Sequence, residues 1–325
     1  MSFKGKILIF DLHNTLYDEV IEYGFAMKAA LNSFGVPVDM AEVAKAHAHL
    51  GSDWHEDVWD HVDGVKSLDK KNASMLRAQV SRELTQKTAY KDTLDTIRAL
   101  KDEGARIFIA TEATANAAAD AVEWLGLDGV VEAVYSWPYN KDIRKLKHTQ
   151  QRVFPNSLQK PHPAILGQIL YDIARSDGKK VEPAVLIVDT SVDVSCLKLK
   201  TNGIMAKSAQ EALEVRLKFE DDVLKEYAEN TYYIGDSYFK DGFLAHNAGI
   251  KFIHAAYGKK VANQAEFEEA KKILYGVTGW EPYLLQLTQE AQKLPELTAL
   301  IKPFYVCEDS FREFIESQPH DKQAL

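Results

Sequence analysis

Short apolar runs alternate with amphipathic stretches along most of the chain. Runs rich in β-branched and aromatic residues, each ending near a polar residue, predict strands at residues 6–10, 106–110, 130–137, 185–188, 231–234, 251–254 and 303–307. Helical periodicity predicts helices at 93–103, 113–125, 164–175, 207–229 and 311–316. This alternation indicates an α/β fold with a doubly wound, mostly parallel sheet that helices cover on both faces. Ligands of such sheets bind at the carboxyl ends of the strands.

Two regions interrupt the alternation of strands and helices. Residues 17–89 show several helical periodicities and no convincing strand, so we expect a helical module inserted after the first strand. The expected core is therefore residues 1–16 together with residues 90–325. Within that core we expect helical or irregular insertions near residues 175–228 and 261–300.

Composition narrows the classes of function. The 325 residues are 46% hydrophobic and 27% charged, which is typical of globular proteins. The formal net charge of −9 would repel a phosphate backbone, so we expect no nucleic acid partner. The cysteines, Cys196 and Cys307, are too few and too far apart for a thiolate metal cluster, and they indicate a reducing, cytoplasmic location. No apolar run reaches the roughly 18–20 residues of a membrane span, so no membrane association is expected.

Four polar residues stand where predicted strands end or a helix begins. Asp11 and Asp236 each follow a strand, and an unpaired carboxylate is costly to bury, which favours a functional role over a turn cap. Taken alone, Thr111 is better explained as a helix cap and Lys160 as a surface charge. At one edge of a sheet, however, the two carboxylates would bind Mg²⁺, while the lysine and the hydroxyl would neutralise phosphate oxygens.

The order and the amino-acid sequences of these segments resemble the motifs of the haloacid dehalogenase (HAD) superfamily of hydrolases. Together the four motifs are far more specific than any one of them. They are Phe10-Asp11-Leu12-His13-Asn14-Thr15-Leu16, Ile109-Ala110-Thr111, Lys160-Pro161-His162-Pro163, and Gly235-Asp236 with Asp241 and Ala248-Gly249-Ile250.

The resemblance implies a Rossmann-like core and a cap formed by residues 17–89. It further implies Mg²⁺-dependent hydrolysis of a small phosphorylated metabolite through an aspartyl-phosphate on Asp11. By the same resemblance, Thr111 and Lys160 would bind the phosphoryl group. The implied metal ligands are Asp11, the backbone carbonyl of His13 and Asp236, and Asp241 would be a further ligand or would hold the ligands in place.

His13 departs from the family pattern, which has a second aspartate there. In family phosphatases that aspartate protonates the leaving oxygen and then deprotonates the attacking water. Histidine can perform both transfers, so an acid/base role is our first interpretation. The alternatives are a slow or specialised phosphatase or phosphotransferase, or an inactive binding or regulatory protein. A haloacid-type dehalogenase also lacks the second aspartate, but it needs no Mg²⁺ and would leave Asp236 and Asp241 without a purpose.

Asp189 competes with Asp236 for the fourth motif. In the family the acidic strand follows the motif lysine by about one helix and a turn, which is the distance to Asp189, and Asp193 stands at a permitted spacing after it. We prefer Asp236 because Gly235 precedes it and allows a sharp turn, whereas the bulky Val188 precedes Asp189.

The insertions carry two further groups of residues with more than one interpretation. A set of histidines and tryptophans in the helical module lacks i,i+4 histidine pairs, which favours an amphipathic helix over a metal site: His47, His49, Trp54, His55, Trp59 and His61. A basic group before the third motif is a solvated loop or a surface that attracts an anionic substrate: Lys141, Arg144, Lys145, Lys147 and Arg152.

Overall fold

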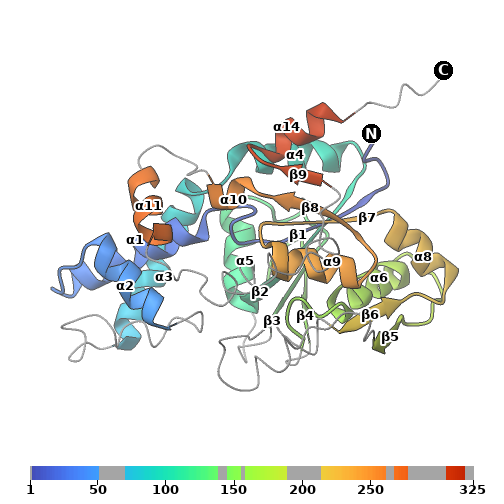
Figure 1. Ribbon diagram of the computed structural model, residues 1–325, viewed down its shortest axis with the longest axis horizontal. Helices are drawn as coiled ribbons and strands as arrows, with labels where there is room; N and C mark the ends of the chain where they lie inside the picture. Colours follow the sequence, from blue (N-terminus) through green and yellow to red (C-terminus); the bar gives the residue numbers. More distant parts are fainter. Residues whose placement is uncertain are drawn as a thin grey trace.

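A parallel sheet forms the centre of the structure (Figure 1). The computed structural model describes residues 2–50, 70–137, 145–154, 158–188, 214–260, 267–276 and 305–318. The seven strands of the sheet lie in the order β4-β3-β2-β1-β7-β8-β9, and all neighbours pair in parallel. They are β1 (Ile7–Phe10), β2 (Arg106–Thr114), β3 (Ala133–Trp137), β4 (Gln150–Val153), β7 (Thr231–Gly235), β8 (Lys251–Ala255) and β9 (Tyr305–Cys307). The predicted α/β fold is therefore confirmed.

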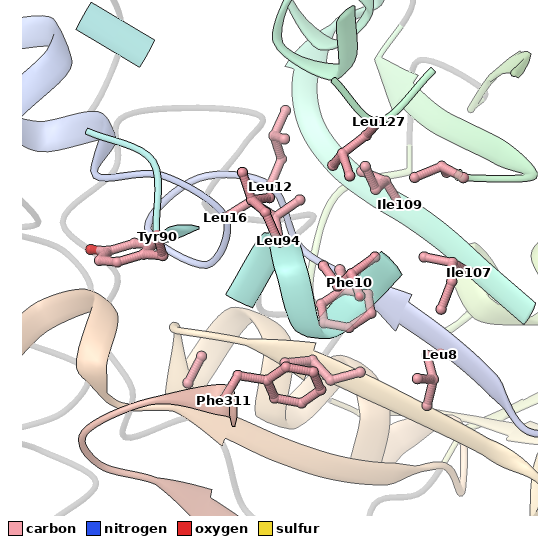
Figure 2. Close-up of a cluster of buried hydrophobic side chains, with 14 of the residues drawn as sticks. Leu8, Phe10, Leu12, Leu16, Tyr90, Leu94, Ile107, Ile109, Leu127 and Phe311 are labelled. Atoms are coloured by element: carbon pink, nitrogen blue, oxygen red, sulfur yellow. The ribbon is translucent and has the colours of Figure 1, made fainter. Parts of the chain in front are cut away.

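Strand β1 is buried on both faces of the sheet. Leu8 and Phe10 belong to the apolar cluster shown in Figure 2, whereas Ile7 and Ile9 belong to a second cluster. Alternate side chains of a strand point to opposite faces, so the uninterrupted apolar sequence of β1 follows from cover on both sides. The helices of the first cluster are α4 (Lys91–Asp102), α5 (Ala115–Trp124) and α14 (Phe311–Ser317), and those of the second are α6 (Ala164–Ser176), α8 (Asp222–Glu229) and α9 (Phe243–Asn247).

The inserted helices form a body beside the sheet (Figure 1). Between β1 and α4 the chain forms α1 (Glu19–Ser33), α2 (Met40–Leu50) and α3 (Lys70–Lys87). Helix α11 (Glu268–Gly276), from the second region predicted as an insertion, packs on α1 and α2, and its Leu274 lies in one apolar cluster with Ile21 and Val43. The helical body is therefore built from two segments far apart in the sequence. No helix within the described residues is long and apolar enough to cross a membrane.

The helix predicted over residues 207–229 is wrong in part. Helix α8 occupies only the end of that range, and β6 (Val215–Lys218) precedes it. Residues 207–213 lie outside the described part of the chain. Two local signals explain the difference. Apolar and polar residues alternate along β6, and the Asp221 carboxylate accepts from the backbone N–H groups of Val223 and Leu224, which starts a helix at that point.

The strand predicted at residues 185–188 exists but does not join the parallel sheet. It forms β5 (Val185–Val188), which pairs with β6 in a separate, two-stranded antiparallel sheet and exposes all four side chains. The parallel sheet instead contains β4, which the apolar pattern does not reveal. This edge strand has the sequence Gln150-Gln151-Arg152-Val153, and an edge position allows polar side chains.

A buried ion pair ties α11 to the start of α1. The Asp18 carboxylate caps α1 by accepting from the Ile21 backbone N–H, and it lies 2.6 Å from the Lys271 ammonium of α11. Lys271 also donates to the carbonyl oxygen of Gly258 at 3.0 Å, in the short helix α10 (Tyr257–Lys260) that follows β8. These bonds connect α1 and α11, the two segments of the helical body, to the residues that follow β8.

Replacing Lys271 with methionine should destabilise the fold, because the Asp18 carboxylate would stay buried without its cationic partner. Breaking a buried pair from one side costs about 3–5 kcal/mol, and urea denaturation should show a loss of this size in the free energy of unfolding. Adding Asp18→Asn should recover most of the loss, since asparagine still caps a helix. Lys272→Met, at the exposed neighbouring position, is the matched control. Equal stability of both methionine variants would contradict the importance of the pair.

Candidate active site

Three strands bring polar residues together at the centre of the carboxyl edge of the sheet. Strand β1 lies between β2 and β7, with Phe10 opposite Ile109 on one side and Ile234 on the other. The residues that follow these positions must therefore meet, and the Asp11 backbone N–H donates to the Ile234 carbonyl oxygen at 2.7 Å. The polar residues predicted for this edge are all buried there: Asp11, Thr111 and Asp236.

Lys160 lies inside this cluster rather than on the surface. Its ammonium contacts Asp11 Oδ1 at 2.5 Å and Asp241 Oδ1 at 2.8 Å. Burial alone would lower the pKa of Lys160, but the carboxylates of Asp11 and Asp241 outweigh burial and raise it well above its usual value. Burial raises the pKa of Asp11 to about 6, although Lys160 acts against this rise. The lysine is therefore a fixed positive charge between two carboxylates.

Asp236 completes a group of three buried carboxylates. One oxygen from each of Asp11, Asp236 and Asp241 lies within 4.8 Å of the others. Gly235 allows this approach, because a side chain there would collide with the Asp241 carboxylate, which comes from the short π-helix η3 (Tyr238–Gly242). Three carboxylates against one ammonium leave an excess of negative charge. A hard divalent cation with oxygen ligands fits this donor set.

Strand β7, and not β5, brings an acid to Asp11. Strand β7 pairs with β1 along its length and leads directly into Asp236. Strand β5 leads toward Asp189 but pairs with β6, outside the parallel sheet. Asp189 and Asp193 themselves lie outside the described residues. Asp189 follows the motif lysine at the distance usual in the family, but the strand before it does not pair with β1.

Thr111 does not cap the helix that follows it. Strand β2 continues to Thr114, whose side chain accepts from the Ala117 backbone N–H and so begins α5. The Thr111 hydroxyl oxygen accepts from the Ala113 backbone N–H at 3.1 Å, where the register between β2 and β3 shifts. This bond uses a lone pair of the oxygen, so the hydroxyl hydrogen can still be donated to an oxyanion.

His13 lies beside the carboxylate group, in a loop shaped by Asn14. Asn14 has φ of 55°, a left-handed conformation that asparagine tolerates better than most residues. His13 Nδ1 lies 3.2 Å from Glu19 Oε1, and the imidazole packs edge-on against Tyr17 with ring centroids 5.6 Å apart. Burial lowers the pKa of His13 to about 4, although Asp11 acts in the opposite direction. Burial therefore favours the neutral form of the imidazole.

The site contains a second ion pair that sequence reasoning missed. Glu112 Oε2 lies 2.8 Å from the Lys240 ammonium, and Glu112 Oε1 accepts from the Lys160 backbone N–H at 3.0 Å. Burial would raise the pKa of Glu112, but Lys240 and Lys160 bring it below its usual value. The only signal in the sequence is adjacency, since Glu112 follows Thr111 and Lys240 precedes Asp241.

The remaining candidates from the sequence lie in other elements or outside the described residues. Arg152 is on β4, which β3 and β2 separate from β1, and it pairs with Asp172 at 3.3 Å. His47 and His49 lie in α2. Several predicted residues of the insertions lie outside the described ranges: Trp54, His55, Trp59, His61, Lys141 and Arg144.

Three solved structures illustrate the similarity of the chain to known proteins. A predicted phosphoglycolate phosphatase from Haemophilus somnus shares 15% identity over 97% of this chain and 98% of that chain, with a TM-score of 0.46. The HAD-hydrolase YfnB from Bacillus subtilis, solved bound to magnesium, shares 13% over 83% and 98%, with a TM-score of 0.45. A HAD-superfamily hydrolase of subfamily IA from Geobacter sulfurreducens shares 14% over 79% and 90%, with a TM-score of 0.43. Identities this low carry no substrate from those proteins to this one.

A protein-family model matches more than half of the chain. Its description is a hydrolase, haloacid dehalogenase-like hydrolase, and it matches residues 6–195. The match includes Asp11, Thr111 and Lys160 but ends before β7, so Asp236 and Asp241 lie beyond it. No curated protein matches the chain. Since the matched segment covers most of the chain from its first strand onward, the chain belongs to the haloacid dehalogenase-like hydrolases.

Proposed function

We propose that this hydrolase is a Mg²⁺-dependent phosphatase that cleaves a small phosphorylated metabolite through an aspartyl-phosphate on Asp11. The observation that supports this most directly is the group of Asp11, Asp236 and Asp241 with Lys160 among them. Such a group suits phosphoryl transfer, in which catalysis is mostly positioning and charge neutralisation. A haloacid-type dehalogenase needs no cation and would gain nothing from three buried carboxylates.

The residues that would hold Mg²⁺ are Asp11, Asp236, Asp241 and, through its backbone carbonyl, His13. All are oxygen donors, as Mg²⁺ prefers. Because only the backbone of His13 would bind the cation, the imidazole is left for proton transfer. When bound, the cation neutralises oxygens of the phosphoryl group during its transfer.

Asp11 is the nucleophile in the proposed reaction. One of its carboxylate oxygens attacks phosphorus, the bond from phosphorus to the ester oxygen breaks, and that oxygen leaves with a proton from His13. Water then attacks the phosphorus of the aspartyl-phosphate, gives a proton to His13, and releases inorganic phosphate and the Asp11 carboxylate. Lys160 and Thr111 bind the other phosphoryl oxygens, and Lys160 also favours the ionised form of Asp11.

His13 must pass between two protonation states in this cycle. The neutral form, which partial burial of the imidazole favours, is the one that accepts a proton from water. A phosphate dianion bound beside the ring favours the protonated form, which the leaving oxygen needs. The negative charge of the substrate therefore favours protonation of His13, the group that protonates the leaving oxygen.

We further propose that residues 17–89 form a cap over a core of residues 1–16 and 90–325. Helix α1 starts at Glu19, which contacts His13, so this helical body adjoins the site. Helix α11 packs on α1 and would extend the cap. Such a cap excludes water from the reaction and selects the substrate by the residues that it places over the phosphate.

Asp11→Asn should abolish release of inorganic phosphate from p-nitrophenyl phosphate and from alkyl phosphate esters. The amide is nearly isosteric with the carboxylate but cannot attack phosphorus. Thermal unfolding should show that the variant remains folded. Substantial activity in the variant would refute the aspartyl-phosphate, and a wild-type protein that cleaves no ester would instead support the inactive, ligand-binding alternative.

Mg²⁺ should stabilise the protein without any substrate, since the folded carboxylate group binds it and the unfolded chain does not. At a concentration of 100 times Kd the gain is about 2.7 kcal/mol, seen as a rise in Tm. Asp236→Asn should remove this rise. Asp222→Asn, which removes an equal charge from an exposed side chain of α8, should keep it. Equal Mg²⁺ responses in the two variants would place the cation elsewhere.

His13→Ala should slow hydrolysis of alkyl phosphates by roughly 10²–10⁴-fold, the usual range for general acid–base catalysis. The loss should be much smaller for p-nitrophenyl phosphate, whose leaving group needs no proton. His13→Asp should restore turnover of alkyl phosphates and move the pH optimum downward, because a carboxylic acid titrates lower than an imidazole. If both variants match the wild type on every ester, His13 takes no part in proton transfer.

A further inference from the structure

Glu112 lies near the end of β2, and both oxygens of its carboxylate accept hydrogen bonds. Its Oε1 atom accepts from the Lys160 backbone N–H at 3.0 Å, and its Oε2 atom accepts from the Lys240 ammonium at 2.8 Å. Only 26% of each side chain of the Glu112–Lys240 pair is exposed, so solvent screens this pair little. Lys160 precedes α6, whereas Lys240 lies in η3 beside Asp241. One side chain of β2 therefore connects two segments that each contribute a charged group to the site.

Lys160 is held both at its backbone and at the end of its side chain. The ammonium contacts the carboxylates of Asp11 and Asp241, and the backbone N–H contacts Glu112. In the proposed reaction Asp11 attacks phosphorus and the ammonium binds a phosphoryl oxygen, so the contacts of the ammonium must change. The bond from the backbone N–H takes no part in the chemistry and can persist throughout the cycle. It is therefore the contact best able to keep Lys160 in place.

Lys240 is fixed in turn by the hydrogen bonds of η3. Its backbone N–H donates to Ser237 Oγ at 3.2 Å, which caps the start of this short helix. The Asp241 carboxylate accepts from the Ser237 backbone N–H at 3.0 Å in the same turn. Because one turn holds both residues, a bond to the Lys240 ammonium also restrains the position of Asp241.

We propose that Glu112 is a positioning residue, which links the Lys160 backbone to Lys240 and so fixes the distance between the Lys160 ammonium and Asp241. The inference rests on the proposed phosphatase function. Glu112 and Lys240 carry opposite charges, so the pair leaves the net charge of the site unchanged and acts through geometry. A displacement of about 1 Å in a group that positions the substrate can slow a reaction by about 10²-fold.

Two other roles for the Glu112–Lys240 pair lead to different results. In the first, the pair only stabilises the fold, and breaking it lowers stability without changing the reaction. In the second, Lys240 binds an anionic group of the substrate and Glu112 competes for the same ammonium. Removing Glu112 would then free Lys240 and strengthen the binding of phosphate, whereas loss of the proposed link displaces Lys160 and weakens that binding.

The kinetic test compares Glu112→Ala with the wild type on p-nitrophenyl phosphate in the presence of Mg²⁺. Displacement of Lys160 should lower kcat by up to about 100-fold. Glu112→Gln should lose less, because its amide oxygen still accepts from the Lys160 N–H. Glu103→Ala, which removes an exposed acid near the other end of β2, should match the wild type. Wild-type kcat in Glu112→Ala, or a Glu112→Gln variant as slow as Glu112→Ala, would overturn the proposal.

Binding of inorganic phosphate separates the link from a direct role of Lys240. Calorimetry with inorganic phosphate and Mg²⁺ should show weaker binding in Glu112→Ala and in Lys240→Met, since each variant breaks the same link. The double variant should bind no more weakly than Glu112→Ala alone, because residues that act through one contact are not additive. Tighter binding in Glu112→Ala would assign Lys240 to the substrate and refute the positioning role.

The link can be measured whether or not the protein is a phosphatase. Amide hydrogen exchange followed by NMR should be about tenfold faster at Lys160 in Glu112→Ala, because this N–H loses a charged acceptor. Exchange at Ile9, in the central strand, should change much less. Unchanged exchange at Lys160, or an equal increase at both positions, would refute the positioning role even in an active phosphatase. Faster exchange at Lys160 alone, in a protein that hydrolyses no ester, would keep the link and refute the proposed function instead.

Discussion

The crowding of negative charge at the carboxyl edge of the sheet is the constraint on which the site depends. Asp11, Asp236 and Asp241 are buried within reach of one another, and repulsion between them opposes folding. Lys160 offsets part of this charge, so the loop before α6 must reach into the centre of the sheet. Glu112 holds that loop by accepting from the Lys160 backbone N–H. The residues around the carboxylates thus offset their negative charge or hold the lysine that does so.

The same constraint reaches the inserted helices through Gly258. A side chain at this position would collide with the carbonyl oxygen of Asn14, so α10 lies directly against the loop that follows Asp11. The carbonyl oxygen of Gly258 accepts from Lys271 of α11 and from the Tyr90 hydroxyl at the start of α4. The helical body is therefore attached next to the buried carboxylates, where a small displacement of α1 would alter the loop that holds His13.

The sequence predicts the parallel sheet and the identity of its charged edge because both follow from local patterns. A strand covered on both faces is apolar throughout, as β1 is, and an acid directly after it stands out. What the sequence does not predict depends on pairing between distant segments. The apolar runs of β5 and β7 look alike and both lead toward an acid, and the one local signal that favours β7 is Gly235 before Asp236. That β5 lies in a separate two-stranded sheet while β7 pairs with β1 is seen only in the fold.

Ion pairs between distant segments escape prediction for the same reason. Lys271 stands in a polar helix, and its partner Asp18 lies at the opposite end of the chain. Glu112 and Lys240 each adjoin a predicted site residue, yet only the fold shows that they pair. The family match likewise ends at residue 195, so it does not reach the two acids after β7, and the pairing of β7 with β1 is what brings them beside Asp11.

Histidine in place of the second aspartate changes how charge is distributed at the site. An aspartate there would add a fourth carboxylate beside three that already repel one another, and it would donate a proton only if that repulsion kept it protonated. Histidine responds to its surroundings in the opposite way, because its protonated form carries the charge. Partial burial lowers the pKa of the imidazole and so favours a ring without charge at the crowded edge, whereas nearby negative charge favours its protonation. Under the proposed function, the proton donor is therefore formed by the arrival of the anionic substrate.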